Sequence, residues 1–201
     1  MSEEPNMSRQ LILILGGARA GKSSYALRLA EERERVYGTN VCFIATAEAL
    51  DDEMRERIAL HRASRPSHWL TLEEPKQLDR ALSQARDAEV VIVDCLTMFV
   101  SNWLLATQDS GACEKEVSRI VESSLAIVAK SRQTIICVSN EVGLGLVPET
   151  SLGRTFRDVL GRVNQQVAQA ATQIYFLVAG LPLRLSRSEM PVINVENIKN
   201  P

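Results

Sequence analysis

The sequence predicts an α/β fold in which a mostly parallel central sheet is flanked by helices. Five short apolar runs alternate along the chain with longer segments of helical period. The runs are continuously apolar, which is typical of strands covered on both faces, as in a parallel sheet. A glycine-rich loop follows the first run, and open α/β sheets bind ligands beyond the carboxyl ends of their strands. The runs are Leu11–Leu15, Val41–Ala45, Val90–Asp94, Ile135–Ser139 and Ile174–Val178.

The connecting segments carry apolar side chains at the spacing of amphipathic helices. Two long stripes lie within residues 117–128 and 152–167. A shorter helix follows Pro75, which we expect at the first helical position. Strands that alternate with helices in this way indicate an open α/β sheet. The apolar positions of the shorter helix are Leu78, Ala81, Leu82 and Ala85.

The chain has 201 residues, which we interpret as a single domain spanning residues 1–201. Its fractions of hydrophobic residues, 45%, and of charged residues, 24%, match an ordinary globular protein. We expect residues 1–9 to form a flexible N-terminus. Residues 184–201 are more polar and include two prolines, so they form either an edge strand or a loosely held tail of unknown role.

The charge balance and the cysteines exclude several classes of protein. Lys and Arg number 23 against 25 Asp and Glu, and this net charge of −2 gives no reason to expect a nucleic-acid partner. No apolar run approaches the roughly 20 residues that cross a bilayer, so we expect no membrane span. The cysteines lack metal-ligand spacing and predict core residues of a cytoplasmic protein. They are Cys42, Cys95, Cys113 and Cys137.

The loop after the first apolar run matches the pattern GxxxxGK[ST] and precedes a helical segment. Its glycines let backbone N–H groups wrap around phosphate oxygens, and the following helix adds the positive end of its dipole. We expect Lys22 to contact the β- and γ-phosphates and Ser23 to offer its hydroxyl to Mg²⁺. A chance lysine in a glycine-rich turn is disfavoured by the order of strand, loop and helix. The loop residues are Gly16, Gly17, Ala18, Arg19, Ala20, Gly21, Lys22 and Ser23.

A second ligand for Mg²⁺ is expected at the end of a buried strand. Asp94 ends the third apolar run and fits this role, either directly or through water. The alternative is that Asp94 caps the helical segment that starts at Leu96, because Asp is a favoured capping residue. We favour the metal role, because the phosphate loop requires a partner of this kind.

The remaining motifs narrow the class of nucleotide enzyme. A signalling GTPase needs an NKxD segment, but Ser139–Val142 lacks its lysine and its aspartate. The DxxG match at Asp158–Gly161 lies inside a helical stripe, and a DNA motor is disfavoured because the chain has no basic face. The loop and Asp94 therefore predict a P-loop NTPase domain of the RecA-like class that acts as a small-molecule kinase or transferase.

Sequence blocks along the chain follow one another in a distinctive order. They are Gly16–Ser23, Ile44–Ala47, Asp51–Met54, Arg57–Arg62, Arg65–Trp69, Asn140–Glu149 and Phe156–Gln165. In order and spacing they closely resemble the bifunctional adenosylcobinamide kinase/adenosylcobinamide-phosphate guanylyltransferase family of cobalamin biosynthesis. The resemblance runs from about Gln10 to Pro182, and only the phosphate loop is mechanistically specific by itself.

This resemblance implies two successive reactions. The family first phosphorylates the hydroxyl of the aminopropanol arm of adenosylcobinamide with ATP or GTP. It then transfers GMP from GTP to adenosylcobinamide phosphate through a histidine–GMP intermediate, which yields adenosyl-GDP-cobinamide and pyrophosphate. The implied partners are GTP, ATP, adenosylcobinamide and its phosphate, and the resemblance also implies a homotrimer.

The chain has two histidines, His61 and His68. From the residues alone, Asp51 or Asp52 caps a helix in which Met54, Ile58 and His61 share one face, and the alternative to a functional role is a histidine at the edge of this packed stripe. In the family pattern the nucleophile precedes a basic residue and a nearby Arg-Pro, and His61 before Arg62 matches it. The resemblance therefore implies that His61 is the nucleophile, whereas we expect His68 to be structural.

The resemblance extends to further nucleotide-contacting positions. Thr46 and Glu73 align with such positions, and Arg62 and Arg65 could clamp the triphosphate. For each of them the alternative is a solvated polar surface. The Asn140–Glu149 loop is expected to line the corrinoid or nucleotide site, unless it is an ordinary strand-to-helix connection.

The sequence gives alternatives for three arginines of the last helical stripe and for the function. Arg154, Arg157 and Arg162 either reach phosphates or form pairs four residues apart, such as Arg154 with Asp158. Two rival functions also remain, namely a P-loop kinase without nucleotidyl transfer and a nucleotide-sensing regulator that binds GTP and a partner protein without turnover.

Overall fold

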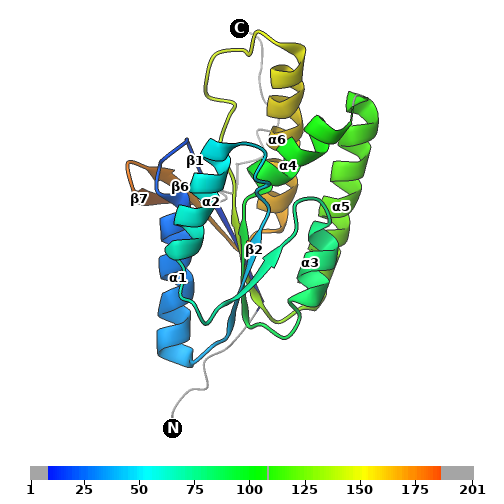
Figure 1. The fold of residues 1–201 in the computed structure, drawn as a ribbon. Coiled ribbons are helices and arrows are strands. Elements are labelled where there is room, and N and C mark those ends of the chain that lie inside the picture. Colours follow the sequence, from blue (N-terminus) through cyan, green and yellow to red (C-terminus); the bar gives the residue numbers. More distant parts are fainter. Residues whose placement is uncertain (1–8, 108, 187–201) are drawn as a thin grey trace, which may run out of the picture.

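The structure is a computed structural model that describes residues 9–107 and 109–186. Its central sheet has seven strands in the order β3-β2-β4-β5-β1-β6-β7, and only the β6–β7 pair is antiparallel (Figure 1). The strands are β1 (Gln10–Gly16), β2 (Val41–Ala45), β3 (Leu70–Glu73), β4 (Val90–Asp94), β5 (Thr134–Val138), β6 (Gln173–Val178) and β7 (Leu181–Leu185). The helices are α1 (Lys22–Tyr37), α2 (Asp52–Ala63), α3 (Leu78–Gln84), α4 (Leu96–Ala106), α5 (Ser110–Lys130) and α6 (Ser151–Ala170). Across the described ranges, none of these helices is long and apolar enough to cross a membrane.

The five predicted strands are confirmed as β1, β2, β4, β5 and β6. β3 has no counterpart among the predictions, and β7 overlaps the predicted edge strand or tail only at Arg184 and Leu185. The two additional strands lie at the edges of the sheet. No residue of β3 is buried, and β7 is exposed along its whole length. Edge strands of this kind lack the continuous apolar run that marks a central strand. Ser139, the last residue of the fourth predicted run, lies just beyond β5.

The start of the polar C-terminal segment is an edge strand. Arg184 and Leu185 belong to β7, which pairs with β6 after a turn at Ala179 and Gly180. Residues 187–201, and residues 1–8 of the predicted flexible N-terminus, lie outside the described residues.

Side chains alternate along the strands between two apolar layers. Leu11 and Leu13 of β1 pack in the layer beneath α3, α4, α5 and α6, whereas Ile12 and Ile14 belong to the layer on the other face. That second layer is covered by α1, and α2 lies on the same side of the sheet without contributing a buried residue (Figure 1). Continuous apolar runs are what a sheet covered on both faces requires.

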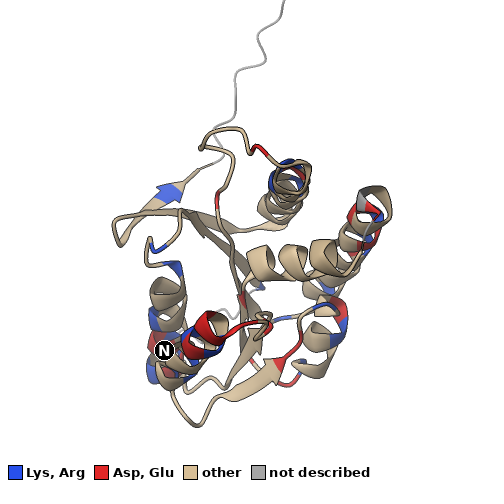
Figure 2. Cartoon of the chain, turned by 45° about the horizontal axis from the view of Figure 1, so that its top comes forward, with Lys and Arg blue, Asp and Glu red and all other residues tan. Residues whose placement is uncertain are grey.

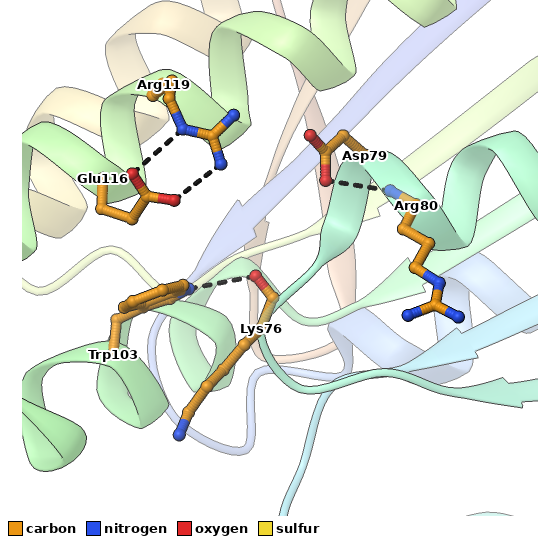
Figure 3. A network of polar contacts seen from close by, with 6 residues as sticks. All are labelled: Lys76, Asp79, Arg80, Trp103, Glu116 and Arg119. Atoms are coloured by element: carbon orange, nitrogen blue, oxygen red, sulfur yellow. Dashed lines mark hydrogen bonds and ion pairs between the residues drawn. The ribbon is translucent and has the colours of Figure 1, made fainter.

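Pro75 is not the first residue of α3, so that prediction is wrong. The helix begins after its N-cap residue Gln77. Glu74 explains the delay, because its Oε1 accepts hydrogen bonds from the backbone N of Lys76 at 3.1 Å and of Gln77 at 2.9 Å. Trp103 of α4 stabilises this segment between β3 and α3, because its Nε1 donates to the carbonyl oxygen of Lys76 at 3.0 Å (Figure 3).

Candidate active site

The phosphate loop joins β1 to α1 and requires glycine at both of its ends. Gly16 has a φ of 149°, and a Cβ at this position would lie 2.6 Å from the carbonyl oxygen of Leu177 in β6. Gly21 is the N-cap of α1 with a φ of 93°, and a Cβ there would lie 3.3 Å from the Cα of Gly180. Glycine adopts such backbone angles without steric cost. The loop therefore closes against the β6–β7 turn and places the N-terminus of α1 at the carboxyl edge of the sheet, where phosphate can bind.

Lys22 begins α1 and turns back over the loop. It is 8% exposed, and its Nζ donates to the carbonyl oxygen of Gly17 at 2.6 Å. Burial lowers the pKa of Lys22, interactions with Cys95 and Asp94 partly raise it, and repulsion from Arg57 lowers it again. Lys22 thus lies within electrostatic reach of both β4 and α2. A phosphate would offer its ammonium a stronger partner than a neutral carbonyl.

Asp94 lies at the end of β4, and β5 separates that strand from β1. The capping alternative fails, because the N-cap of α4 is Cys95 and no side chain caps that helix. The half-buried carboxylate of Asp94 faces the same edge of the sheet as the phosphate loop and acts electrostatically on Lys22. This placement leaves Asp94 as a candidate for the metal.

Ser23 and Asp94 are the two predicted ligands of Mg²⁺. Ser23 lies in the first turn of α1, so the donor set is one hydroxyl and one carboxylate. No group of three or more His, Cys, Asp or Glu side chains within the described ranges could hold a metal ion by itself. Mg²⁺ characteristically keeps several waters and binds one or two protein ligands together with substrate phosphates. The residues therefore fit a Mg²⁺ that arrives with the nucleotide.

His61 lies in the last turn of α2, a helix that begins as the sequence predicts. Asp51 is its N-cap, and the Oδ1 of Asp51 accepts a hydrogen bond from the backbone N of Met54 at 2.7 Å. Met54, Ile58 and His61 are half-buried and share the expected face, but no residue of α2 is buried. His61 thus lies at the edge of an apolar stripe, as the alternative to a functional role has it, and its role as nucleophile stays a prediction.

Arg57 places α2 within electrostatic reach of the phosphate loop. Arg57 precedes His61 by four residues, and side chains at this spacing lie on the same side of a helix. The effect of Arg57 on the pKa of Lys22 indicates that this side lies near the loop. An approach of the His61 imidazole to a phosphate at this loop stays a prediction.

A pocket of about 750 Å³ lies where the end of α2 meets β3. It is lined by Arg62, Ala63, Arg65, Pro66, Ser67, Trp69, Thr71 and Glu73. Three of the predicted nucleotide residues, Arg62, Arg65 and Glu73, thus meet in one hollow. Arg62 of α2 forms an ion pair with Glu73 of β3, so each side chain compensates the charge of the other.

Arg65 connects this pocket to the sheet. Its Cζ lies 3.5 Å from the centroid of the Phe43 ring, which is a cation–π contact. Burial lowers the pKa of Arg65, attraction to Asp94 opposes this, and nearby Arg62 lowers the pKa further. A guanidinium stays charged in proteins in spite of such shifts. Arg65 therefore holds a fixed positive charge between the pocket and the carboxylate of Asp94.

Thr46 lies beside these residues with its side chain fully buried. Its Oγ1 donates to the carbonyl oxygen of Cys95 and accepts from the backbone N of Cys95, each at 2.7 Å. The hydroxyl is thus engaged with the backbone after β4. A nucleotide contact by Thr46 stays a prediction.

His68 makes the structural contact that the sequence predicts. Its Nε2 lies 2.6 Å from the Oε1 of Glu34 on α1, and Trp69 donates from Nε1 to the Oε2 of Glu34 at 3.0 Å. Burial raises the pKa of Glu34, but the hydrogen bonds to His68 and Trp69 outweigh it, so that the pKa is lowered. These hydrogen bonds link the chain before β3 to α1, and they engage the imidazole of His68.

The Asn140–Glu149 loop lies beside the phosphate loop. The backbone N of Glu141 donates to the carbonyl oxygen of Gly16 at 3.1 Å. The tip is strongly exposed although it is apolar, since Leu144 is 81% and Leu146 is 96% exposed. This placement is what a site-lining loop requires, and its contact with substrate stays a prediction.

The arginines of α6 bind protein groups rather than forming the predicted pair. Arg154 donates to two carbonyl groups of the preceding loop, at 2.9 and 2.6 Å. The suggested pair of Arg154 with Asp158 is therefore wrong, because Asp158 pairs with its neighbour Arg157 at 3.1 Å. Arg162 pairs with Glu114 of α5 at 2.8 Å.

Two residues of the site are not among the predicted ones. Phe43 supports Arg65 from within β2, and no pattern in the sequence distinguishes it from other core residues of that strand. Arg57 lies one turn before His61, and this helical spacing is the signal that could have identified it.

Comparisons with known proteins agree with this arrangement. The family model described as "Cobinamide kinase / cobinamide phosphate guanyltransferase" matches residues 12–185. The bifunctional adenosylcobalamin biosynthesis protein CobU of Escherichia coli (strain K12) is 38% identical over an alignment of 184 residues, which covers 87% of this chain and 99% of that protein. The bifunctional adenosylcobalamin biosynthesis protein CobP of Pseudomonas aeruginosa is 45% identical over 174 residues, which are 86% of this chain and 95% of that protein.

Solved structures with little sequence identity share the fold. A KaiC-like protein from Pyrococcus horikoshii OT3 superposes with a TM-score of 0.50 at 13% identity, covering 84% of this chain and 71% of that one. The flagellar accessory protein FlaH from Methanocaldococcus jannaschii superposes with a TM-score of 0.51 at 18% identity, covering 87% of this chain and 75% of that one. The predicted fold class, an α/β fold with a mostly parallel central sheet flanked by helices, is confirmed.

Proposed function

The chain belongs to the cobinamide kinase / cobinamide phosphate guanyltransferase family and is a bifunctional enzyme of adenosylcobalamin biosynthesis, and we propose that both of its reactions use one nucleotide site at the phosphate loop. In the kinase reaction the hydroxyl oxygen of adenosylcobinamide attacks the γ-phosphorus of ATP or GTP. The bond from that phosphorus to the β-phosphate oxygen breaks, and the hydroxyl proton is released. In the transferase reaction GTP gives up GMP and pyrophosphate leaves.

The phosphate loop and its neighbours bind the triphosphate in both reactions. Lys22 exchanges its bond to the Gly17 carbonyl for the β- and γ-phosphate oxygens, and the N-terminus of α1 supplies further donors. Mg²⁺, held by Ser23 and Asp94, would offset the charge on these oxygens. Positioning and charge compensation supply most of what a phosphoryl transfer needs from the protein.

His61 is the nucleophile of the transferase reaction. One imidazole nitrogen attacks the α-phosphorus of GTP, a nitrogen–phosphorus bond forms, and the bond to pyrophosphate breaks. A phosphate oxygen of adenosylcobinamide phosphate then attacks the same phosphorus, and the imidazole leaves. The support from the structure is the position of His61 in the last turn of α2, a helix that has no buried residue and whose Arg57 lies within electrostatic reach of Lys22.

The arginines next to His61 stabilise the phosphates of GTP. Arg65 supplies a fixed charge that Phe43 and Asp94 hold in place. Arg62 is paired with Glu73, and we propose that nucleotide binding redistributes this pair, with the guanidinium turning to phosphate and Glu73 to a donor of the nucleotide. Thr46 is proposed to contact the nucleotide through a backbone group, because its hydroxyl is engaged.

The binding site of the corrinoid and the oligomeric state of the protein are proposed together. Adenosylcobinamide is too large to be enclosed within a domain of this size, so a cleft between subunits is a suitable site. We therefore propose a homotrimer, as the resemblance implies. Light scattering of an active preparation checks this, and a monomer alone would contradict it.

We also propose that the protein acts in the cytoplasm. Its four cysteines are free, and three of them are buried. Burial raises the pKa of Cys42 and Cys95 to about 11 and that of Cys137 to about 12, so these thiols are unreactive core groups. Unpaired core cysteines are typical of a reducing compartment.

The observation that carries the proposal is the convergence of the phosphate loop, Asp94 and the His61 helix at one edge of the sheet. The experiment is incubation with GTP, Mg²⁺ and adenosylcobinamide, followed by mass analysis of the corrinoid. We expect adenosyl-GDP-cobinamide. A kinase without nucleotidyl transfer would stop at adenosylcobinamide phosphate, and a nucleotide-sensing regulator would form neither product.

A further inference from the structure

A buried polar junction joins the segments that follow β2 and β3. Its centre is Asn102 of α4, which is 2% exposed. The Nδ2 of Asn102 donates to the carbonyl oxygen of Thr46 at 2.7 Å and to that of Pro75 at 3.1 Å. Thr46 comes directly after β2 and Pro75 comes two residues after β3, so one side chain of α4 cross-links the chain beyond both strands.

Thr46 extends the junction to β4. Besides its two hydroxyl bonds to Cys95, its backbone N donates to the carbonyl oxygen of Asp94 at 3.2 Å. Hydrogen bonds in an apolar interior are strong, and a buried polar group that loses its partner is costly. The junction therefore fixes the ends of three strands relative to one another.

Each of the three joined segments carries or leads to a residue of the site. The segment after β2 leads into α2 and His61, β3 ends at Glu73, which pairs with Arg62, and β4 ends at Asp94. Since no residue of α2 is buried, packing against the core does not fix this helix. Its placement depends on the segments at its two ends and on the ion pair of Arg62.

We propose that Asn102 is a positioning residue for guanylyl transfer, which acts by holding the segments on either side of α2 and does not touch the nucleotide. This inference rests on the proposed function, in which His61 accepts GMP. The two hydrogen bonds that the Nδ2 of Asn102 donates provide this positioning, because its Oδ1 has no hydrogen-bond partner among the described residues. The kinase reaction instead depends on Lys22, Ser23 and Asp94. Lys22 and Ser23 follow β1 on the far side of β5, and Asp94 ends β4, a strand with four buried residues to which Asn102 donates no hydrogen bond. Loss of Asn102 should therefore slow one reaction and spare the other.

Gln133 provides a matched control at the opposite edge of the sheet. It is 8% exposed, and its Nε2 donates to the carbonyl oxygens of Ala85 at 2.8 Å and Ala88 at 2.5 Å. Like Asn102, it is a buried carboxamide that cross-links two backbone carbonyls. Because it precedes β5, it lies at the amino edge, away from the site.

The experiment compares Asn102→Leu with Gln133→Met in the full chain. Three quantities are measured: thermal unfolding, the rate at which saturating α-phosphate-labelled GTP labels the protein without corrinoid, and the ATP-dependent phosphorylation of adenosylcobinamide. Displacing a reacting group by about 1 Å can cost roughly 10²-fold in rate, so we expect Asn102→Leu to label about 10- to 100-fold more slowly. Its kinase rate should stay close to that of the wild type, and Gln133→Met should change neither rate appreciably.

Several results separate this positioning role from a purely structural one. The proposal is overturned if both reactions slow equally in Asn102→Leu. It is also overturned if Gln133→Met slows labelling as much and leaves the kinase rate unchanged. If Asn102→Leu does not fold, Asn102→Ser takes its place, because serine retains a small polar group. Asn102→Ser should slow labelling by a smaller factor and leave the kinase rate close to that of the wild type. An equal loss of both reactions in Asn102→Ser overturns the proposal. A wild-type protein that takes up no label would overturn the histidine step itself, and the inference with it.

Discussion

α2 and α4 are helices of similar length that both follow a strand at the carboxyl edge, yet they are held in opposite ways. α4 contains no charged residue and buries Leu96, Phe99, Val100 and Leu104 among others. Half of the residues of α2 are charged, and none is buried. Figure 2 shows this contrast as a red and blue helix on the side of α1 and a tan helix on the other face.

The difference separates the scaffold of the site from its reactive part. Asp94 and Asn102 have positions that the packing of α4 and β4 determines. His61 lies on a helix whose place depends on a capping aspartate, an ion pair and the junction around Asn102. Substitutions of the buried apolar residues of α4 should therefore change stability, whereas substitutions in α2 should change one reaction and leave the fold intact.

The largest expected effect concerns the loop that both reactions share. Lys22→Ala should slow the kinase and the guanylyltransferase reactions together, because one lysine holds the triphosphate in each. Removing a charge-stabilising contact of this kind typically costs about 10²–10³-fold in rate. Steady-state assays of both reactions check this, with the exposed Lys115→Ala of α5 as the control. Near-normal kinase turnover in Lys22→Ala would contradict the single site.

A pair of leucines tests the difference in packing directly. Leu104 of α4 is 5% exposed, whereas Leu60 of α2 is 72% exposed. Leu104→Ala should lower the free energy of unfolding by about 2–5 kcal/mol, the usual cost of truncating a buried leucine. Leu60→Ala should change it by less than about 0.5 kcal/mol. Denaturant unfolding measures both, and equal losses would show that α2 belongs to the core.

The smallest effect concerns the cluster that anchors the chain before β3. The pKa of Glu34 is lowered in the folded protein, so its carboxylate stabilises the fold above the ordinary pKa of Glu, and this contribution is lost as the pH falls through the lowered value. The cluster lies near the surface, so the contribution is at most about 1 kcal/mol. Unfolding of the wild type and of Glu34→Gln should differ above about pH 5 and converge as the pH falls below the ordinary pKa of Glu. A difference that grows in acid would contradict this assignment.

The fold and the phosphate loop could be predicted because local physics specifies them. The β1 run is apolar on both faces, and Gly16 and Gly21 are required where the backbone has positive φ. Asp51 was identifiable as a cap for the same reason, since its carboxylate meets the helix N-terminus directly. Such features depend on neighbours in the sequence.

The rest of the site depends on contacts that the sequence does not display. Arg65 over Phe43, and Asn102 between Thr46 and Pro75, join residues far apart in the chain. The edge strand β3 lacks an apolar run, so the position of Glu73 opposite Arg62 could not be read from periodicity. His61 was identified through its resemblance to a family pattern, because a half-buried histidine on a polar helix has no distinctive spacing.

The central claim, that His61 of the exposed helix accepts GMP, is tested by labelling with α-phosphate-labelled GTP. The denatured wild-type protein should retain label that is acid-labile and alkali-stable, as a phosphoramidate is. His61→Ala should take up no label while it still binds nucleotide and retains kinase activity, because Lys22, Ser23 and Asp94 are intact. His68→Ala should keep the label. Label that persists in a folded His61→Ala protein, or that disappears only in His68→Ala, would contradict the account.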